Sequence, residues 1–220
     1  MEQSRAAHFL RRKATQMSDA VKICNAAAVM LGAGVIQSLE DDTDLSRIFA
    51  NLYERKKLAI MSKYPWRFLA ETFYLTRLAT PPVQGFRYAY VIPGNALAGA
   101  PHAIFLYQQQ KLGTRDYRVS GKRVLSDHPE LWAELIVDRP EGEWPEYFQE
   151  LMIHAIAADV ALAITDQQSI ADRHYQTAYG TPSEGGFGGL MGQAMLLDSQ
   201  SQDDAGIETD FFVYARRGAW

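Results

Sequence analysis

Apolar side chains recur at three- and four-residue steps in two stretches near the N-terminus, the spacing of a helix with one buried face. The first stretch predicts a helix over residues 19–31, with Ser18 as its N-cap and glycines beyond its end. The second predicts a helix over residues 45–63, which stops before Pro65 because the residue preceding a proline disfavours helical backbone. Its apolar stripe comprises Leu45, Ile48, Phe49, Leu52, Ala59 and Ile60.

Between residues 68 and 138 the pattern changes to short runs rich in Tyr, Phe, Val and Ile, separated by turn residues. Residues 116–127 have the form of a hairpin that turns at Ser120-Gly121. The region therefore predicts an antiparallel β domain. The expected strands are Phe73–Leu78, Phe86–Ile92, Ala103–Gln108, Tyr117–Val119, Lys122–Ser126 and Leu131–Val137.

Helical spacing returns after Pro145, a residue favoured in the first turn of a helix. A third helix is expected to end near Thr165, and a fourth to run from Ser169 through Tyr179. A glycine-rich stretch follows and is interpreted as a hinge, formed by Gly185, Gly186, Gly188 and Gly189. Beyond it, a short helical piece from Leu190 to about Ser199 leads into an acidic tail.

The order helices, strands, helices predicts an α+β fold, in which a bundle of about four helices carries an inserted antiparallel β domain and an extended C-terminal arm. Residues 17–67 and 139–179 would form the bundle, and residues 68–138 the β domain. Residues 1–16 are interpreted as a basic, flexible N-terminal arm. Residues 180–220 are interpreted as the hinge and a C-terminal docking arm.

Composition narrows the possible functions. The chain has 220 residues and a net charge of −4, so as a whole it does not attract nucleic acid, and sequence-specific DNA reading is not expected. Cys24, the only cysteine, cannot form an intrachain disulfide and is expected to be a core side chain. The N-terminal residues contain no apolar segment of a secretory signal, and no stretch of about 20 apolar residues suggests a membrane span.

Motifs of catalysis and metal binding are weak. There is no P-loop, the glycine run does not fit a dinucleotide-binding register, and the five histidines lack metal-ligand spacing. Asp41, Asp42 and Asp44 are interpreted as acids at a helix N-terminus. Glu146 and Glu150 lie four residues apart and could pair as in a carboxylate hydrolase. The balance of these observations predicts a non-enzyme that needs no cofactor or metal.

An ordered series of segments resembles one family. The series begins with the helix from Met17 to Gly32 and continues through Tyr64-Pro-Trp-Arg-Phe68, Leu78-Ala-Thr-Pro-Pro82 and Trp144-Pro-Glu-Tyr-Phe148. Over residues 17–180 the chain resembles the tail tubular protein A, or head-to-tail adaptor, family of short-tailed bacteriophages. Two features depart from that family: the glycine-rich interruption after Tyr179, and the first sixteen residues.

The resemblance implies a structural virion protein, made in the host cytoplasm, that assembles as a dodecameric ring at the head–tail junction. The ring joins the portal protein to the tail nozzle protein, helps to hold tail fibres, and lets genomic DNA pass through its bore. Our hypothesis is that the C-terminal aromatics dock against the portal: Phe211, Phe212, Tyr214 and Trp220. Nozzle and fibre contacts are expected at the β-domain tyrosines Tyr88, Tyr90, Tyr107 and Tyr117.

Two alternatives from other classes remain open from the sequence. One is a phage-associated hydrolase that cleaves peptidoglycan with the acids Glu141, Glu143, Glu146 and Glu150. The other is a monomeric binding module with no role in a virion.

Overall fold

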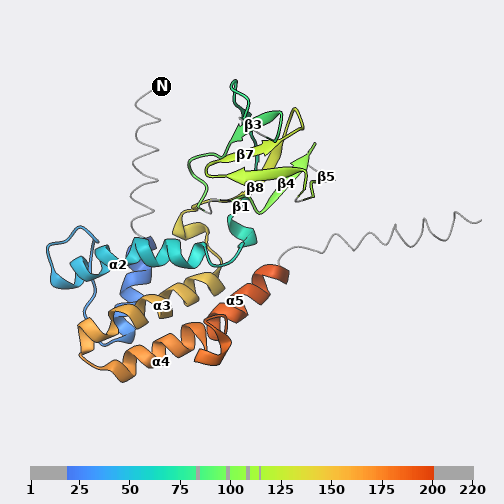
Figure 1. Ribbon diagram of the computed structural model, residues 1–220. Helices are drawn as coiled ribbons and strands as arrows, with labels where there is room; N and C mark the ends of the chain where they lie inside the picture. Colours follow the sequence, from blue (N-terminus) through green and yellow to red (C-terminus); the bar gives the residue numbers. More distant parts are fainter. Residues whose placement is uncertain (1–18, 83–84, 98–99, 108–109, 114, 201–220) are drawn as a thin grey trace, which may run out of the picture.

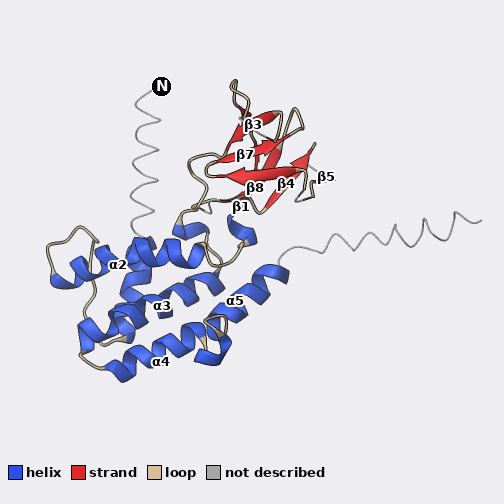
Figure 2. Cartoon of the chain, in the orientation of Figure 1, coloured by secondary structure: helices blue, strands red, loops and turns tan. Residues whose placement is uncertain are grey.

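The computed structural model describes residues 19–200 except 83–84, 98–99, 108–109 and 114. It has the expected α+β architecture, in which a helical bundle carries a separate block of antiparallel strands (Figures 1 and 2). The strands lie between the second and third long helices in the chain, as an insertion. The expected N-terminal arm lies outside the described residues.

The bundle is built around helix α3 (Glu146–Thr165), which packs against α2 (Asp44–Met61), α4 (Gln168–Tyr179) and α5 (Gly189–Gln200). A further helix covers residues 19–30 and buries its apolar face, Cys24 included, in the same core. Burial raises the pKa of the Cys24 thiol to about 12, with nearby Glu141 adding to the effect, so the thiol is an inert core group. The buried side chains of α3 are Phe148, Leu151, Met152, Ala155, Ile156, Ala157, Ala158, Val160 and Ala161.

Local chemistry sets the start of α2. The Thr43 hydroxyl accepts the backbone N–H of Ser46 at 3.1 Å, which caps one of the unpaired donors of the first turn. Asp44 follows in that turn and pairs with Arg47, while Asp41 accepts two loop amides. The acids around this N-terminus therefore have structural partners, although Thr43, and not one of the acids, is the N-cap.

The Tyr64–Phe68 segment forms the aromatic centre of the bundle. Trp66 is fully buried and donates its indole N–H to the carbonyl of Ile60 at 3.1 Å. Its ring meets Phe148 edge-on with 4.9 Å between centroids, and Phe148 meets Trp144 at 5.1 Å. Because these rings come from both sides of the insertion, they fix the two halves of the bundle together.

The β domain is a sandwich of two four-stranded antiparallel sheets. The first sheet has the order β1-β8-β4-β5 and the second β2-β3-β7-β6. Their inner faces enclose a core that is separate from that of the bundle and includes Leu75, Tyr90, Ile104, Val124 and Leu135. The strands are β1 (Ala70–Tyr74), β2 (Thr76–Arg77), β3 (Tyr88–Val91), β4 (Ala103–Leu106), β5 (Gln110–Lys111), β6 (Tyr117–Ser120), β7 (Arg123–Ser126) and β8 (Trp132–Ile136).

The expected hairpin forms as predicted, with β6 and β7 paired from Tyr117–Ser126 to Ser120–Arg123 around Gly121. Three short 3-10 turns complete the structure: η1 (Arg67–Leu69), η2 (Glu141–Glu143) and η3 (Pro182–Glu184). The first two connect the bundle to the sandwich at the start and the end of the insertion.

The segment after α4 differs from the expectation of a hinge and a free arm. Residues 189–200 form α5, which confirms the helical piece expected from Leu190 to about Ser199, but its Met191, Ala194 and Asp198 are buried against the bundle. The Asp198 carboxylate accepts the backbone N–H of Arg67 at 2.7 Å and the hydroxyl of Tyr147 at 3.0 Å. This part of the expected docking arm is therefore a fifth helix of the bundle.

The glycine-rich loop between α4 and α5 is ordered by close contacts. The Glu184 carboxylate accepts the backbone N–H of Thr181 at 2.7 Å, and Gly188 donates its N–H to Tyr179 at 3.1 Å. Gly189 has φ +55°, and a Cβ there would lie 2.8 Å from the Gly180 nitrogen and closer still to the Thr177 carbonyl oxygen. The expected hinge Gly185, Gly186, Gly188 and Gly189 is thus part of a tight turn that seats α5 on α4.

Candidate functional site

A buried ionic cluster lies where the bundle meets the sandwich. Lys57 of α2 has a side chain only 5% exposed and lies 3.2 Å from Asp138 and 3.5 Å from Glu141. Tyr53, one turn earlier on α2, donates its hydroxyl to the same Glu141 carboxylate at 3.1 Å. Burial acts to lower the pKa of Lys57, but Glu141 and Asp138 outweigh it and hold the pKa above its ordinary value.

The two buried charges of this cluster, Lys57 and Glu141, compensate each other. Glu141 receives Tyr53 and Lys57, and Lys57 has a third carboxylate partner in the exposed Glu54 at 3.2 Å. Because Asp138 and Glu141 follow β8 and Lys57 belongs to α2, the ion pairs fasten the end of the insertion to the bundle. We assign the cluster a structural role.

The acids considered for hydrolysis are dispersed among different partners. Glu141 is buried in the ionic cluster, Glu143 lies 3.6 Å from Arg139, and Glu150 lies 3.4 Å from His154. Glu146 stands in the exposed first turn of α3. Glu146 and Glu150 lie on one face of α3, as their spacing predicts, but Glu150 contacts the imidazole of His154.

The histidine of α3 pairs across the bundle. Nδ1 of His154 lies 3.1 Å from Nδ1 of His174 on α4, and Asp159, also on α3, forms an ion pair with Lys56 of α2 at 2.6 Å. Within the described ranges, no group of three or more His, Cys, Asp or Glu side chains is placed to hold a metal ion.

Of the four β-domain tyrosines expected to make contacts, one is buried. Tyr90 is 0% exposed in the sandwich core and donates its hydroxyl to the carbonyl of His128, so it is no contact residue. Tyr88 and Tyr117 are half-buried against the same core. Tyr107 is 75% exposed at the end of β4, with φ +51°. Only Tyr107 has the exposure that the expectation requires.

Tyr107 belongs to an exposed aromatic cluster that the sequence analysis did not identify. Trp132 of β8 lies at its centre, with its ring centroid 5.2 Å from that of Tyr74 and 6.0 Å from that of Tyr107. Tyr74 is 56% exposed and pairs directly with Trp132 across β1 and β8. We call Tyr74, Tyr107 and Trp132 the aromatic surface. Large exposed aromatics gathered on one sheet face are typical of protein–protein contacts.

The aromatic surface lies on the outer face of the first sheet. In register with it, Ala70 and Ile136 at the other end of β1 and β8 pack toward the bundle core. The same sheet face is therefore covered by the bundle at one end and open at the other. In the sequence, Tyr74 and Trp132 appear only as aromatic residues of two separate predicted strands. The pairing of β1 with β8 brings them together.

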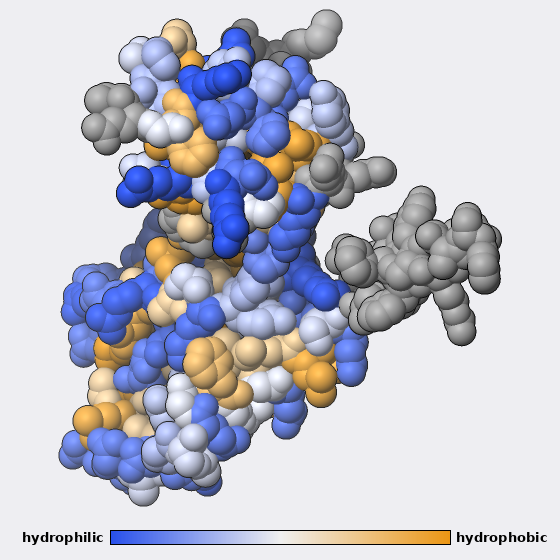
Figure 3. All heavy atoms as spheres, turned by 45° about the vertical axis from the view of Figure 1, so that its right-hand side comes forward, coloured by the Kyte–Doolittle hydropathy of each residue, from blue (hydrophilic) through white to orange (hydrophobic). Residues whose placement is uncertain are grey.

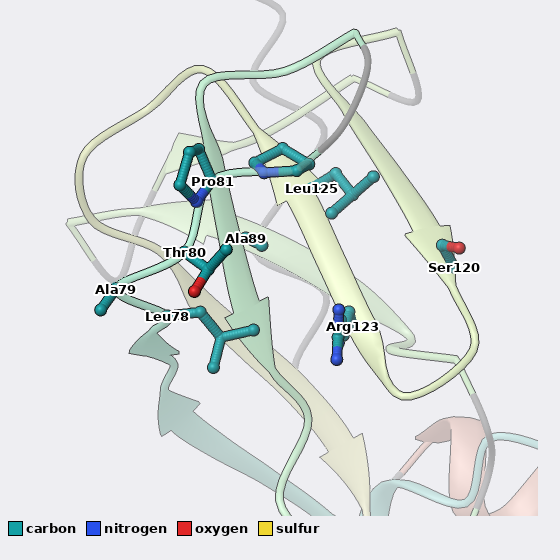
Figure 4. A pocket seen from close by; sticks show the side chains of 9 residues that line it. Leu78, Ala79, Thr80, Pro81, Ala89, Ser120, Arg123 and Leu125 are labelled. Atoms are coloured by element: carbon teal, nitrogen blue, oxygen red, sulfur yellow. The ribbon is translucent and has the colours of Figure 1, made fainter.

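A groove lies on the outer face of the second sheet (Figure 4). Its cavity of about 580 Å³ has an apolar floor of Ala89 from β3 and Leu125 from β7, and Arg123 projects at one end. The segment 78–82, with Pro81 and Pro82, forms its wall. A smaller neighbouring cavity shares Leu78, Ser120 and Arg123 and adds Val91, Gly121 and Lys122.

The face of the molecule seen in Figure 3 is mainly polar, with apolar residues in separate groups over both the bundle and the sandwich. Several large apolar side chains of the bundle are exposed: Val29, Val35, Leu58, Leu162, Tyr175, Phe187, Leu196 and Leu197. The proposed portal-docking aromatics Phe211, Phe212, Tyr214 and Trp220 lie outside the described residues.

Helix α3 is an exception to the expectation that no segment is long and apolar enough to span a membrane. By length and composition it is apolar enough to cross one, and 44% of its most apolar window is buried inside the bundle. It packs against three other helices, so its apolar side chains already form the centre of a protein core.

A scan against protein-family models finds no match to this sequence, and a search of curated proteins finds no similar one.

Proposed function

We propose that this chain is a structural virion protein, the subunit of a head-to-tail adaptor ring that joins the portal to the tail nozzle of a short-tailed bacteriophage. The sequence resemblance over residues 17–180 supports the proposal. So does the agreement between the architecture that it implies and the observed bundle with its inserted β domain.

The observation that carries the proposal is the division of the molecule into a bundle and a sandwich, each with its own core and its own exposed apolar side chains. A ring subunit needs two faces for neighbouring copies and two ends for different partners. The bundle offers exposed apolar side chains on several helices, and the sandwich offers the aromatic surface at its open end.

In the proposed assembly the bundle forms the ring wall and contacts the portal, while the aromatic surface contacts the nozzle or a fibre. Genomic DNA passes through the bore without sequence-specific binding. A net charge of −4 favours that passage, because an anionic wall repels phosphates.

The test is assembly with the portal protein of the same phage. Native mass spectrometry and electron microscopy of the mixed proteins should show a ring on the portal with twelve copies of this chain. A portal that stays bare at micromolar concentrations of both proteins would refute the proposal, as would infectious virions that lack the chain. A monomer in the absence of portal is compatible with it, because a portal can template the ring.

A further inference from the structure

The groove on the second sheet has the size and lining of a site for an extended peptide. Its volume of about 580 Å³ falls in the range of ordinary ligand sites. The floor is apolar through Ala89 and Leu125, Leu78 adds an apolar side chain to the wall, and the neighbouring cavity extends the groove past Val91. The two cavities share lining residues and run along β3 and β7, so together they form an elongated trough.

The rim of the groove is cationic. Arg123 and Lys122 line it, and Arg118, exposed on β6, stands opposite Leu125 in the strand register. None of the three makes an ion pair with a carboxylate among residues 19–200 as described. The lining contains no acid. Charge complementarity therefore favours an occupant that is both apolar and acidic.

This chain contains one such segment beyond α5. Residues 203–213 read DDAGIETDFFV, with four acids and no basic residue. Ile207, Phe211, Phe212 and Val213 supply apolar side chains, and the acids precede or alternate with them. The segment thus matches the apolar floor and the cationic rim together.

The segment can reach the groove of its own subunit. Asp198 holds the end of α5 against the backbone of Arg67, at the base of the sandwich. Leu78 is eleven residues after Arg67 and can lie no farther from it than about 36 Å, less because Arg67–Leu69 is a 3-10 turn. Phe211 is eleven residues after Gln200, where α5 ends, and can extend about 36 Å from that point.

We propose that residues 203–213 occupy this groove in the same subunit, with Phe211 or Phe212 over Leu125 and the acids against Arg118, Lys122 and Arg123. Tethering raises the local concentration of the segment to the order of millimolar, which favours its own groove over that of another copy. The inference goes beyond the adaptor function and stands whether or not the chain forms a ring.

Cross-linking of the full chain tests the proposal. A water-soluble carbodiimide joins a lysine amine to a nearby carboxylate, so Lys122 should be linked within the monomer to Asp203, Asp204, Glu208 or Asp210. Peptide mass spectrometry of the monomer band identifies the link. The double variant Arg118→Glu/Arg123→Glu retains Lys122 but should lose at least about nine-tenths of the link, because it reverses the rim charge.

Arg55→Glu is the matched control, since Arg55 is an exposed arginine on α2, away from the groove. It should leave the yield of the Lys122 link unchanged. The proposal is overturned if Lys122 forms no link, or if the double variant forms it as efficiently as the natural chain. A link found only in a dimer band also overturns it, because a second copy would then be the occupant.

A binding measurement with unaltered sequences makes the test independent of folding of the variants. The buried contacts described above all lie within residues 19–200, so a chain that ends at Gln200 keeps them. A fluorescent peptide of residues 201–220 should bind this shortened chain at least about tenfold more tightly than the full chain, whose groove is already filled. Equal affinity for both chains would contradict occupancy by the chain's own segment.

Discussion

The buried side chains Lys57, Glu141 and Asp198 stand at contacts between elements, where each has a specific partner. Lys57 and Glu141 join α2 to the end of the β domain, and Asp198 joins α5 to its beginning. A buried charge is tolerated only where a partner compensates for the lost hydration. These residues therefore define how the bundle holds the insertion.

The environment of the His174 side chain disfavours the protonated form of its imidazole. It is buried between α3 and α4, its Nε2 has no hydrogen-bond partner among the described residues, and it faces His154. Burial, the charge of His154 and that of Arg173 lower its pKa below the ordinary 6.5. Glu150, 3.4 Å from the far side of His154, is the acid of this group.

We predict that His174 destabilises the fold in mild acid. The unfolded chain binds the proton near pH 6.5, whereas the folded chain binds it only at lower pH, so stability is lost as pH falls from 6.5 through the folded pKa. His174→Gln, which stays neutral, should show a smaller drop in the urea unfolding midpoint between pH 7.5 and pH 5.5 than the natural chain.

His102→Gln is the control, because the His102 side chain is 45% exposed on the sandwich. It should keep the pH dependence of the natural chain. The same drop in all three proteins would show that His174 does not govern acid stability.

At the scale of elements, the junction between α4 and α5 decides whether the chain beyond Tyr179 is part of the bundle. Gly189 begins α5 with a positive φ and lies against the last turn of α4. A hinge would tolerate a side chain there, because it makes no close contacts. A tight turn would not.

Gly189→Ala should lower the free energy of unfolding by about 2 kcal/mol or more, since it adds a steric clash to the cost of a left-handed backbone. Gly121→Ala is the matched control, because Gly121 has φ +58° and open space around its Cβ position. It should cost about 1 kcal/mol, from the backbone alone. Urea unfolding of both variants measures the difference, and equal losses would indicate a loose α4–α5 junction.

At the scale of the whole molecule, the two separate cores allow the bundle and the sandwich to serve different partners. The bundle is closed around α3, and the sandwich stands out from it (Figure 1). The aromatic surface lies on one sheet of the sandwich and the groove on the other. Contacts made at these outer faces do not require either core to change.

The adaptor proposal predicts that the aromatic surface is needed for binding of the tail nozzle and not for folding. Tyr74→Ser/Tyr107→Ser should weaken nozzle binding by at least about tenfold, because exposed tyrosines that become buried in an interface dominate its affinity. Thermal stability should change little, since both side chains are more than half exposed. Pull-down or calorimetry with the nozzle protein measures the loss.

Tyr175→Ser provides the comparison, because Tyr175 is 50% exposed on α4, outside the aromatic surface. It should retain nozzle binding. If the double variant also retains it, the nozzle contact lies elsewhere on the protein.

The sequence by itself determined the order of elements and the α+β class. Helical and strand periodicities are local, and the residues that bound the elements lie beside them, as Thr43 and Pro145 do at the starts of α2 and α3. The hairpin at Gly121 and the burial of Cys24 were predictable for the same reason.

Only the tertiary structure decided which side chains meet. Tyr88 and Tyr90 lie two residues apart on one strand, yet only Tyr90 is fully buried, with its hydroxyl bonded to the backbone of His128, a residue distant in the sequence. The packing of α5, the His154–His174 pair and the aromatic surface likewise join residues distant in the chain. Local patterns fix each element's form, whereas contacts between elements depend on how all of them pack together.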